Sequence, residues 1–206
     1  MEIHTYLRGL RTEFDKIPVD RISALESIGN FVANSLSENV LADLVFICTH
    51  NSRRSQFGQI WALTAARYYG LNNVRTFSGG TEETAFNPNA IAALERAGFS
   101  VEKSAGSAAN PVYSIQSGAE TQESSMFSKK IDDPANPVQN FCAIMVCSAA
   151  DETCPIIPGA AERISLPYRD PKDFDGKTLE HREYDERCRE VARDLLWVFH
   201  NLSLDR

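Results

Sequence analysis

Apolar residues recur at helical spacing through the first 40 positions of the chain. They form two runs: Leu7, Leu10, Phe14 and Ile17 in the first, and Ile22, Leu25, Ile28, Val32 and Leu36 in a second that begins near Pro18. Residues three or four positions apart share one face of an α-helix, so each run predicts an amphipathic helix. We expect these helices to pack on the protein core or on a second subunit, and nothing in them indicates catalysis.

Beyond residue 41, short apolar runs alternate with helical patterns. The runs at 42–47 and 142–146 are hydrophobic without alternation, which is typical of strands buried on both faces of a parallel sheet. Further strands are predicted at 74–77 and 164–166, and helices at 54–69 before Gly70, from Asn87–Pro88 to Gly98, and at 179–202. This alternation indicates an α/β fold with a doubly wound parallel sheet, in which ligands bind at the carboxyl ends of the strands.

Residues 104–140 interrupt the alternation with a stretch rich in Ser, Ala, Asn, Pro and Gly. Within it, Val112–Ile115 and Met126–Lys129 have the pattern of two short hairpin strands. A lid, a decoration of the sheet and a mobile surface loop are all compatible with this composition. The chain is thus predicted to have an N-terminal helical extension (residues 1–40) and an α/β domain (residues 41–206) with an insertion at about 104–140.

Composition narrows the class of protein. With 206 residues, 43% of them hydrophobic, the chain can bury one α/β core. Its formal net charge of -7 argues against nucleic acid as a partner, because a phosphate backbone requires a basic surface. No stretch is apolar over the length that spans a bilayer, so no membrane contact is expected, and the first residues lack the layout of a secretion signal. We therefore expect a cytoplasmic protein.

The segment from Cys48 to Ser55 reads Cys-Thr-His-Asn-Ser-Arg-Arg-Ser and joins the strand at 42–47 to the following helix. Backbone N–H groups at such a junction form a nest for a tetrahedral oxyanion, with the positive end of the helix dipole behind it. The same field favours the thiolate form of Cys48, and Arg54 offers a planar fork to two oxygens of the anion. The residues predicted to bind the oxyanion are Thr49, His50, Asn51, Ser52, Arg53 and Arg54, and the Asn51 side chain is expected to brace the loop.

The other cysteines are Cys142, Cys147, Cys154 and Cys188. They form no Cys-x-x-Cys pair and have no matching His, so we expect no metal site and no cofactor. In a reducing compartment they suit catalytic or redox roles better than a disulfide framework. The residues between Cys147 and Cys154 favour a helical turn that stops before Pro155, which would separate the two thiols by about 10 Å. A disulfide tolerates Cα separations of at most about 7 Å, so bonding would require the turn to melt. Spacing alone leaves both a redox switch and two unrelated cysteines open.

Several segments together resemble the low-molecular-weight protein tyrosine phosphatase superfamily: residues 44–56, Phe77–Thr81 with Asn87–Asn89, and Asp170–Pro171. Within that superfamily, Cys147-Ser-Ala-Ala-Asp-Glu-Thr-Cys154-Pro155 is similar to the segment that carries the two downstream thiols of the thioredoxin-coupled arsenate reductases. The resemblance covers most of residues 42–204 apart from the insertion, and it leaves out the N-terminal extension. It favours the redox switch over two unrelated cysteines.

The resemblance implies a role for each residue of the loop and for one distant carboxylate. Cys48 is the nucleophile that attacks arsenate, Arg54 holds the oxyanion and Ser55 hydrogen-bonds the thiolate. Asp170 is the general acid that protonates the leaving oxygen. The segment Arg-Asp-Pro-Lys-Asp also suits a plain turn, and Asp173 and Asp175 are close by in the sequence.

The resemblance also implies a relay among three thiols. Cys147 attacks the Cys48–arsenic adduct, which releases arsenite and leaves a Cys48–Cys147 disulfide. Cys154 then resolves this bond by exchange, and thioredoxin or a similar thiol reductant receives the Cys147–Cys154 disulfide.

The chain departs from the family pattern in three places. His50 stands where these loops usually carry Gly, and Arg53 replaces a Cys often found beside the Arg. The residues after Asp170–Pro171 do not include the pair of Tyr that walls the tyrosine pocket of many phosphatases. Two alternatives to an arsenate reductase remain: a phosphatase acting on phosphotyrosine or small phosphoesters through a phosphocysteine, and a non-catalytic oxyanion-binding or redox-sensing module. The joint presence of Cys48, Arg54 and Asp170 argues against the second.

Overall fold

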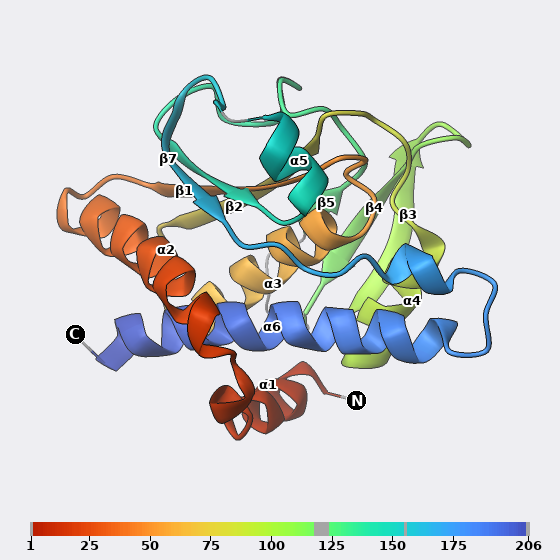
Figure 1. Ribbon diagram of the computed structural model, residues 1–206, viewed down its shortest axis with the longest axis horizontal. Coiled ribbons are helices and arrows are strands. Elements are labelled where there is room, and N and C mark those ends of the chain that lie inside the picture. The colour runs from red at the N-terminus through yellow and green to blue at the C-terminus, as the bar shows by residue number, and fades with distance from the viewer. Residues whose placement is uncertain (1, 118–123, 155, 205–206) are drawn as a thin grey trace.

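The computed structural model describes residues 2–117, 124–154 and 156–204 (Figure 1). At its centre is a four-stranded sheet in the order β2-β1-β6-β7, in which every neighbouring pair is parallel. The strands are β1 (Ala42–Cys48), β2 (Val74–Gly80), β6 (Phe141–Met145) and β7 (Ala160–Ser165). The chain forms β2 on one side of β1 and returns to form β6 on the other, which confirms the predicted doubly wound parallel sheet.

The helices that connect and flank the strands follow the predicted boundaries closely. α3 (Arg54–Tyr68) follows β1 directly, and the chain turns at Gly70, whose φ of 73° is left-handed. α4 (Pro88–Ala97) is capped by the side chain of Asn87, which accepts hydrogen bonds from the first N–H groups of the helix, and it ends at Gly98. α6 (Glu180–Leu204) runs across the whole of Figure 1. None of the helices described is long and apolar enough to cross a membrane.

The N-terminal extension folds onto α6. It consists of α1 (Ile3–Arg11), a 3₁₀ turn η1 (Phe14–Lys16) and α2 (Val19–Ser37), and Figure 1 shows α1 and α2 against α6. Of its nine predicted apolar positions, Leu7, Leu10, Ile17, Leu25, Ile28 and Val32 are buried, and Phe14, Ile22 and Leu36 are partly buried against the same core. The apolar faces of both helices are therefore covered by the core of the same chain.

The predicted insertion, together with the residues just before it, contributes a second, antiparallel sheet in the order β3-β4-β5. Its strands are β3 (Ser100–Gly106), β4 (Pro111–Gln116) and β5 (Ser124–Met126). The predicted pairing of the two hairpin strands is confirmed, but the second strand ends at Met126 instead of Lys129. β3 is not predicted by the sequence pattern, because nearly all its residues are exposed and no apolar alternation marks it. Residues 118–123 of the insertion lie outside the described part of the chain.

Candidate active site

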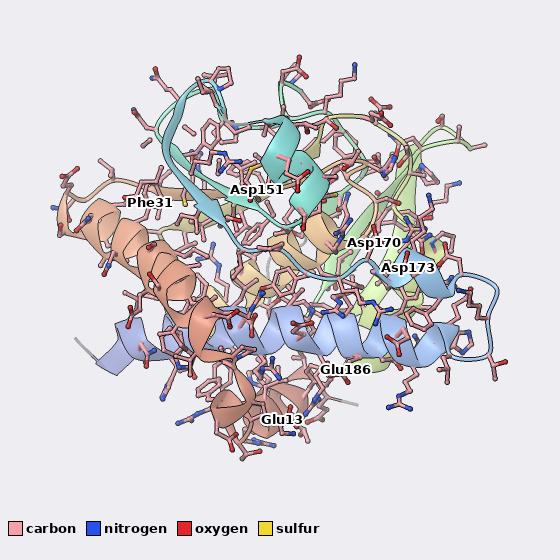
Figure 2. All side chains as sticks on the ribbon, in the orientation of Figure 1. Glu13, Phe31, Asp151, Asp170, Asp173 and Glu186 are labelled. Atoms are coloured by element: carbon pink, nitrogen blue, oxygen red, sulfur yellow. The ribbon has the colours of Figure 1, made fainter. Side chains whose placement is uncertain are left out.

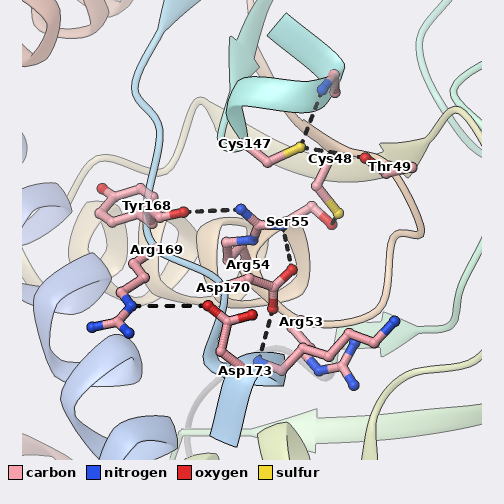
Figure 3. Close-up of polar contacts among 12 residues, drawn as sticks. Cys48, Thr49, Arg53, Arg54, Ser55, Cys147, Tyr168, Arg169, Asp170 and Asp173 are labelled. Carbon is pink, nitrogen blue, oxygen red and sulfur yellow. Dashed lines mark hydrogen bonds and ion pairs between the residues drawn. The ribbon is translucent and has the colours of Figure 1, made fainter.

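The loop from Cys48 to Ser55, called the Cys48 loop below, leaves the carboxyl end of β1 and enters α3. Cys48 is buried, and its Sγ lies 3.0 Å from the hydroxyl of Ser55 (Figure 3). The amide of Asn51 donates to the same hydroxyl at 2.9 Å, and its Oδ1 accepts from the backbone N–H of Lys129 at 2.9 Å. Asn51 has a φ of 45°, so the left-handed residue of the loop is Asn51 and not His50. The predicted bracing by Asn51 is present.

Every carbonyl of the loop from Cys48 to Arg53 accepts a hydrogen bond from the surrounding framework. The acceptor–donor pairs are Cys48–Thr81, Thr49–Glu82, His50–Ser128, Asn51–Gln56, Ser52–Asn87 and Arg53–Phe57. In a planar trans peptide the N–H points away from its carbonyl, so outward carbonyls leave the N–H groups toward the concave side of the loop. This is the arrangement that an anion-binding nest requires.

The loop rests directly on the backbone of β2. A Cβ atom at Gly80 would lie 2.6 Å from the carbonyl oxygen of Thr49 and 2.8 Å from the backbone nitrogen of Asn51. Both are main-chain atoms that cannot move without reshaping the nest. The glycine at the end of β2 is therefore required by the close approach of the loop.

Arg54 connects the loop to the carboxylate predicted as general acid. Its Nη1 donates to the carbonyl of Tyr168 at 2.9 Å and its Nη2 to Oδ2 of Asp170 at 2.5 Å (Figure 3). Asp170 also caps the 3₁₀ turn η2 (Pro171–Phe174) by accepting from the N–H of Lys172. Asp170 thus caps a turn and also faces the Cys48 loop.

The two neighbouring aspartates are engaged elsewhere. Asp173 is largely exposed and pairs with Arg169 at 4.0 Å. Asp175 accepts from Tyr184 at 2.6 Å and from Arg53 at 2.8 Å. Of the three carboxylates near Pro171, Asp170 is the one that pairs with Arg54.

The side chains of Arg53 and His50 point away from the concave side of the loop. The Nε of Arg53 donates to the Tyr184 hydroxyl at 2.6 Å, which ties the loop to α6. Burial, followed by the hydrogen bond to Asp175, raises the pKa of Tyr184 to about 12. His50 is half-exposed and lies 3.5 Å from the carboxylate of Glu82. The side chains of Arg53 and His50 are thus engaged outside the loop, and their predicted part in oxyanion binding rests on their backbone N–H groups.

Cys147 lies beside the Cys48 loop. β1 and β6 are parallel neighbours with Ile47 opposite Met145, so Cys48 at the end of β1 and Cys147 just after β6 lie at the same edge of the sheet. The Cys147 sulfur is buried and lies 3.6 Å from the Thr49 hydroxyl (Figure 3). It also accepts from the N–H of Ala150 at 3.4 Å, as the N-cap of the short helix α5 (Ser148–Thr153). The predicted helical turn between the two downstream thiols is confirmed.

Cys154 ends that helix and is partly exposed. Its N–H donates to the carbonyl of Ala150, and all the cysteines are free thiols. Pro155, predicted to stop the turn, lies outside the described residues. We call the stretch from Cys147 to Cys154 the α5 segment.

One arginine holds the α5 segment onto β7. Arg163 donates to Oδ1 of Asp151 at 2.6 Å and to the carbonyl of Cys154 at 3.1 Å. Ser165 donates to the other carboxylate oxygen of Asp151 at 2.6 Å. Nothing in the sequence marks Arg163 for this role, because the contact depends on how β7 pairs with β6.

Cys142 and Cys188 are buried thiols with no contact to the Cys48 loop among the described hydrogen bonds. Both are buried, and burial raises the pKa of the Cys142 thiol and that of Cys188, the latter to about 12. Trp61 also donates its indole N–H to the sulfur of Cys188. Such thiols are poor nucleophiles near neutral pH. No group of side chains among the described residues is suited to hold a metal ion.

Comparison with known proteins agrees with this geometry. The family described as low molecular weight phosphotyrosine protein phosphatase matches residues 43–117. An arsenate reductase of Brevibacillus brevis is 28% identical over 62% of this chain and 75% of that protein. An arsenate reductase of Bacillus subtilis is 26% identical over 76% of this chain and 93% of that protein.

Solved structures share the fold. An arsenate reductase in its phosphate-binding state has a TM-score of 0.51 at 18% identity, over 79% of this chain and 99% of that one. A mutant of YwlE from Bacillus subtilis also has a TM-score of 0.51, at 16% identity, over 80% of this chain and 99% of that one. With the family match and the sequence relatives, these findings point in one direction. In sequence the chain is similar to the low-molecular-weight protein tyrosine phosphatase superfamily, and within it to the arsenate reductases, whose fold it shares.

Proposed function

We propose that this protein is an arsenate reductase that uses Cys48, Cys147 and Cys154 in sequence. The observation that carries the proposal is the 3.6 Å contact between the Thr49 hydroxyl and the Cys147 sulfur, which puts a second thiol at the rim of the Cys48 loop. Reduction of arsenate to arsenite requires two electrons, and a pair of thiols supplies them by forming a disulfide. The arsenate reductases among the sequence relatives support the choice of substrate.

The first half of the reaction takes place in the Cys48 loop. The Cys48 thiolate attacks arsenic, and a hydroxyl leaves as water after protonation by Asp170. The backbone N–H groups from Thr49 to Arg54 and the Arg54 guanidinium hold the remaining oxygens. The Ser55 hydroxyl, 3.0 Å from Cys48, stabilises the thiolate before attack.

The second half transfers the electrons. The Cys147 thiolate attacks the Cys48 sulfur of the adduct, a Cys48–Cys147 disulfide forms, and the electron pair of the broken sulfur–arsenic bond leaves with arsenite. Cys154 then attacks Cys147, which frees Cys48 and leaves a Cys147–Cys154 disulfide. Thioredoxin or a similar thiol reductant of the cytoplasm would reduce that bond and restore the three thiols.

The structure of the α5 segment is compatible with this transfer. Cys147 and Cys154 stand at opposite ends of a helix, so their bond requires the helix to unfold. The helix has only six residues, and Cys154 is already partly exposed. A single short helix is the kind of element that opens locally at small cost in free energy.

A phosphatase acting on phosphotyrosine or small phosphoesters is the second candidate. The Cys48 loop, Arg54 and Asp170 would suffice for it, since water can hydrolyse a phosphocysteine. The non-catalytic oxyanion or redox sensor is disfavoured, because the general acid is paired directly with the anion-binding arginine.

Substitution of the last thiol separates these candidates. Cys154→Ser should abolish multiple-turnover arsenate reduction with a thioredoxin system, and it should leave hydrolysis of para-nitrophenyl phosphate unchanged. The matched control is Cys142→Ala, which removes a buried thiol outside the relay and should leave both activities intact. Peptide mapping of the oxidised wild type should find the Cys147–Cys154 bond. Equal loss of both activities in Cys154→Ser, or absence of this disulfide, would contradict the relay.

A further inference from the structure

The N-terminal extension reaches the active site through the side chain of Arg21, in the first turn of α2. Its Nε donates to Oδ2 of Asp194 on α6 at 3.0 Å. Its Nη1 donates to the carbonyl of Pro167 at 2.8 Å, and its Cζ lies 4.4 Å from the centre of the Tyr168 ring. The Arg21 guanidinium thus contacts both α6 and the segment that leads to Asp170.

The opposite side of this segment is held by the Cys48 loop. Tyr168 donates its N–H to the carbonyl of Val146 at 3.1 Å, which places it beside the end of β6. Its own carbonyl accepts from Arg54, and the same guanidinium pairs with Asp170 two residues later. The stretch from Pro167 to Asp170 therefore lies between two arginines, one from the loop and one from the extension.

The Arg21 contacts belong to a buried part of the protein. Tyr168 is 4% exposed and Asp194 is fully buried. Burial raises the pKa of Asp194, against the opposing effects of Arg21 and Arg193. Arg193 lies 3.5 Å from one oxygen of Asp194 and Arg21 donates a hydrogen bond to the other, so Arg21 cannot move away from Pro167 and Tyr168 without breaking a hydrogen bond to a buried carboxylate. The position of the 167–168 backbone is thereby coupled to a contact that the fold itself requires.

We propose that Arg21 is a positioning residue for the general acid: it fixes the backbone that carries Asp170, so the N-terminal extension is part of the catalytic unit. The inference rests on the proposed function in its use of Asp170 as the acid. It assigns to the extension, which lies outside the matched family region, a task in catalysis in addition to covering α6.

The test uses the dependence of hydrolysis on the leaving group. Phenolate leaves less readily than para-nitrophenolate, so phenyl phosphate depends more on protonation by the acid than para-nitrophenyl phosphate does. The ratio kcat/KM covers the steps up to release of the phenol, and it is measured for both esters with the full chain. Arg21→Lys keeps a cation beside Asp194, but a single ammonium cannot reach the carbonyl and carboxylate together and stack on the ring.

We expect Arg21→Lys to lower kcat/KM about 10-fold for phenyl phosphate and clearly less for para-nitrophenyl phosphate, because a displaced acid costs most where protonation is most needed. Asp170→Asn should show the same selectivity with a loss of about 100-fold. In the Asp170→Asn background, Arg21→Lys should have no further effect on the ratio between the two esters. The pair Arg21→Gln with Asp194→Asn leaves no unpaired buried carboxylate, and it should reproduce the selective loss.

The matched control breaks another contact between the extension and α6. Glu13 accepts from Arg189 of α6 at 3.0 Å, and Figure 2 shows Glu13 and Asp170 on opposite sides of that helix. Glu13→Gln should leave both esters unchanged.

The possible outcomes separate this inference from the proposed function. If Asp170→Asn is selective and Arg21→Lys affects both esters equally, only the positioning role is overturned. A selective loss in Glu13→Gln would also overturn it, since any loosening of the extension would then suffice. If Asp170→Asn shows no selectivity, the acid of the proposed function is wrong and the inference falls with it.

Discussion

The Cys48 loop and the α5 segment both carry a buried cysteine at the edge of the same sheet, but they are held in different ways. In the loop, every carbonyl from Cys48 to Arg53 is bonded to the framework, and β2 lies against it without an intervening side chain. The α5 segment is one short helix, tied to β7 mainly through Arg163 and Ser165. In the proposed reaction, a nest for a developing charge gains from rigidity, whereas a thiol that passes electrons to a second thiol has to move. Four substitutions test this contrast.

The largest effect is expected from Cys48→Ser. Oxygen is a far weaker nucleophile than a thiolate at neutral pH, so both arsenate reduction and phosphoester hydrolysis should fall by roughly 10⁴-fold or more. The variant should unfold at nearly the wild-type temperature, because Ser55 can bond to the new hydroxyl. Residual turnover near the wild-type rate would mean that another residue is the nucleophile.

A methyl group at Gly80 should damage the rigid region alone. Gly80→Ala forces main-chain atoms of the loop apart, so we expect a loss of about 1–3 kcal/mol in the free energy of unfolding and roughly 10- to 100-fold in phosphoester kcat. Gly29→Ala in α2 is the control. Its new Cβ would lie 3.8 Å from Val198 of α6, an ordinary contact distance, and it should stabilise by up to about 1 kcal/mol. Urea unfolding with steady-state kinetics measures both. Normal activity in Gly80→Ala would show that the loop is not held by close packing.

Arg163→Met should loosen the α5 segment without touching the loop. The side chains of Arg163 and Asp151 are about a quarter exposed, and a loss of about 1 kcal/mol in helix stability would raise the population of the open state about five-fold. Alkylation of Cys147 and oxidation to the Cys147–Cys154 disulfide should accelerate by that factor, with para-nitrophenyl phosphate hydrolysis unchanged. Arg75→Met, which removes a bidentate ion pair with Asp43 on the same sheet, serves as the control. Unaltered alkylation in Arg163→Met would show that opening does not depend on this anchor.

The smallest effect concerns a buried cation behind the rigid loop. Burial lowers the pKa of Lys129 from 10.5 to about 8, so between these values the unfolded chain holds a proton that the folded chain has lost. Stability contributed by this group therefore rises with pH, by about 1 kcal/mol from pH 7 to 9. Lys129→Met should lack that rise while keeping the backbone bond to Asn51, and urea unfolding at both pH values tests it. Parallel pH curves for the two proteins would contradict it.

The contrast between regions also explains what the sequence could predict. β1, β6 and α6 are marked by continuous or periodic apolar residues, and the cap at Asn87 is a local signal, so all were predicted close to their observed bounds. The neighbours of Cys48 in the loop were predictable too, since the motif is contiguous. β3 was missed because an exposed strand has no apolar alternation.

The residues that support the site were not predictable, because their partners are far away in the chain. Lys129 meets Asn51 across 78 positions, and Arg21 meets Asp194 across 173. Neither pair has a sequence pattern, since the meeting depends on which strands and helices become neighbours. The contiguous residues of the Cys48 loop could thus be predicted from the sequence, whereas the distant residues that position them could not.

The register between β6 and β1 determines where the Cys147 sulfur lies relative to the Cys48 loop. Ile47 pairs with Met145, so the register brings Cys147 level with Thr49, whose hydroxyl its sulfur contacts. Because side chains alternate between the two faces of a strand, sliding β6 by one residue would turn Cys147 away from the face of Thr49. No rotamer change could return the sulfur to Thr49. Insertion or deletion of a single residue within Phe141–Met145 would therefore disconnect the two halves of the reaction while leaving each of them chemically whole.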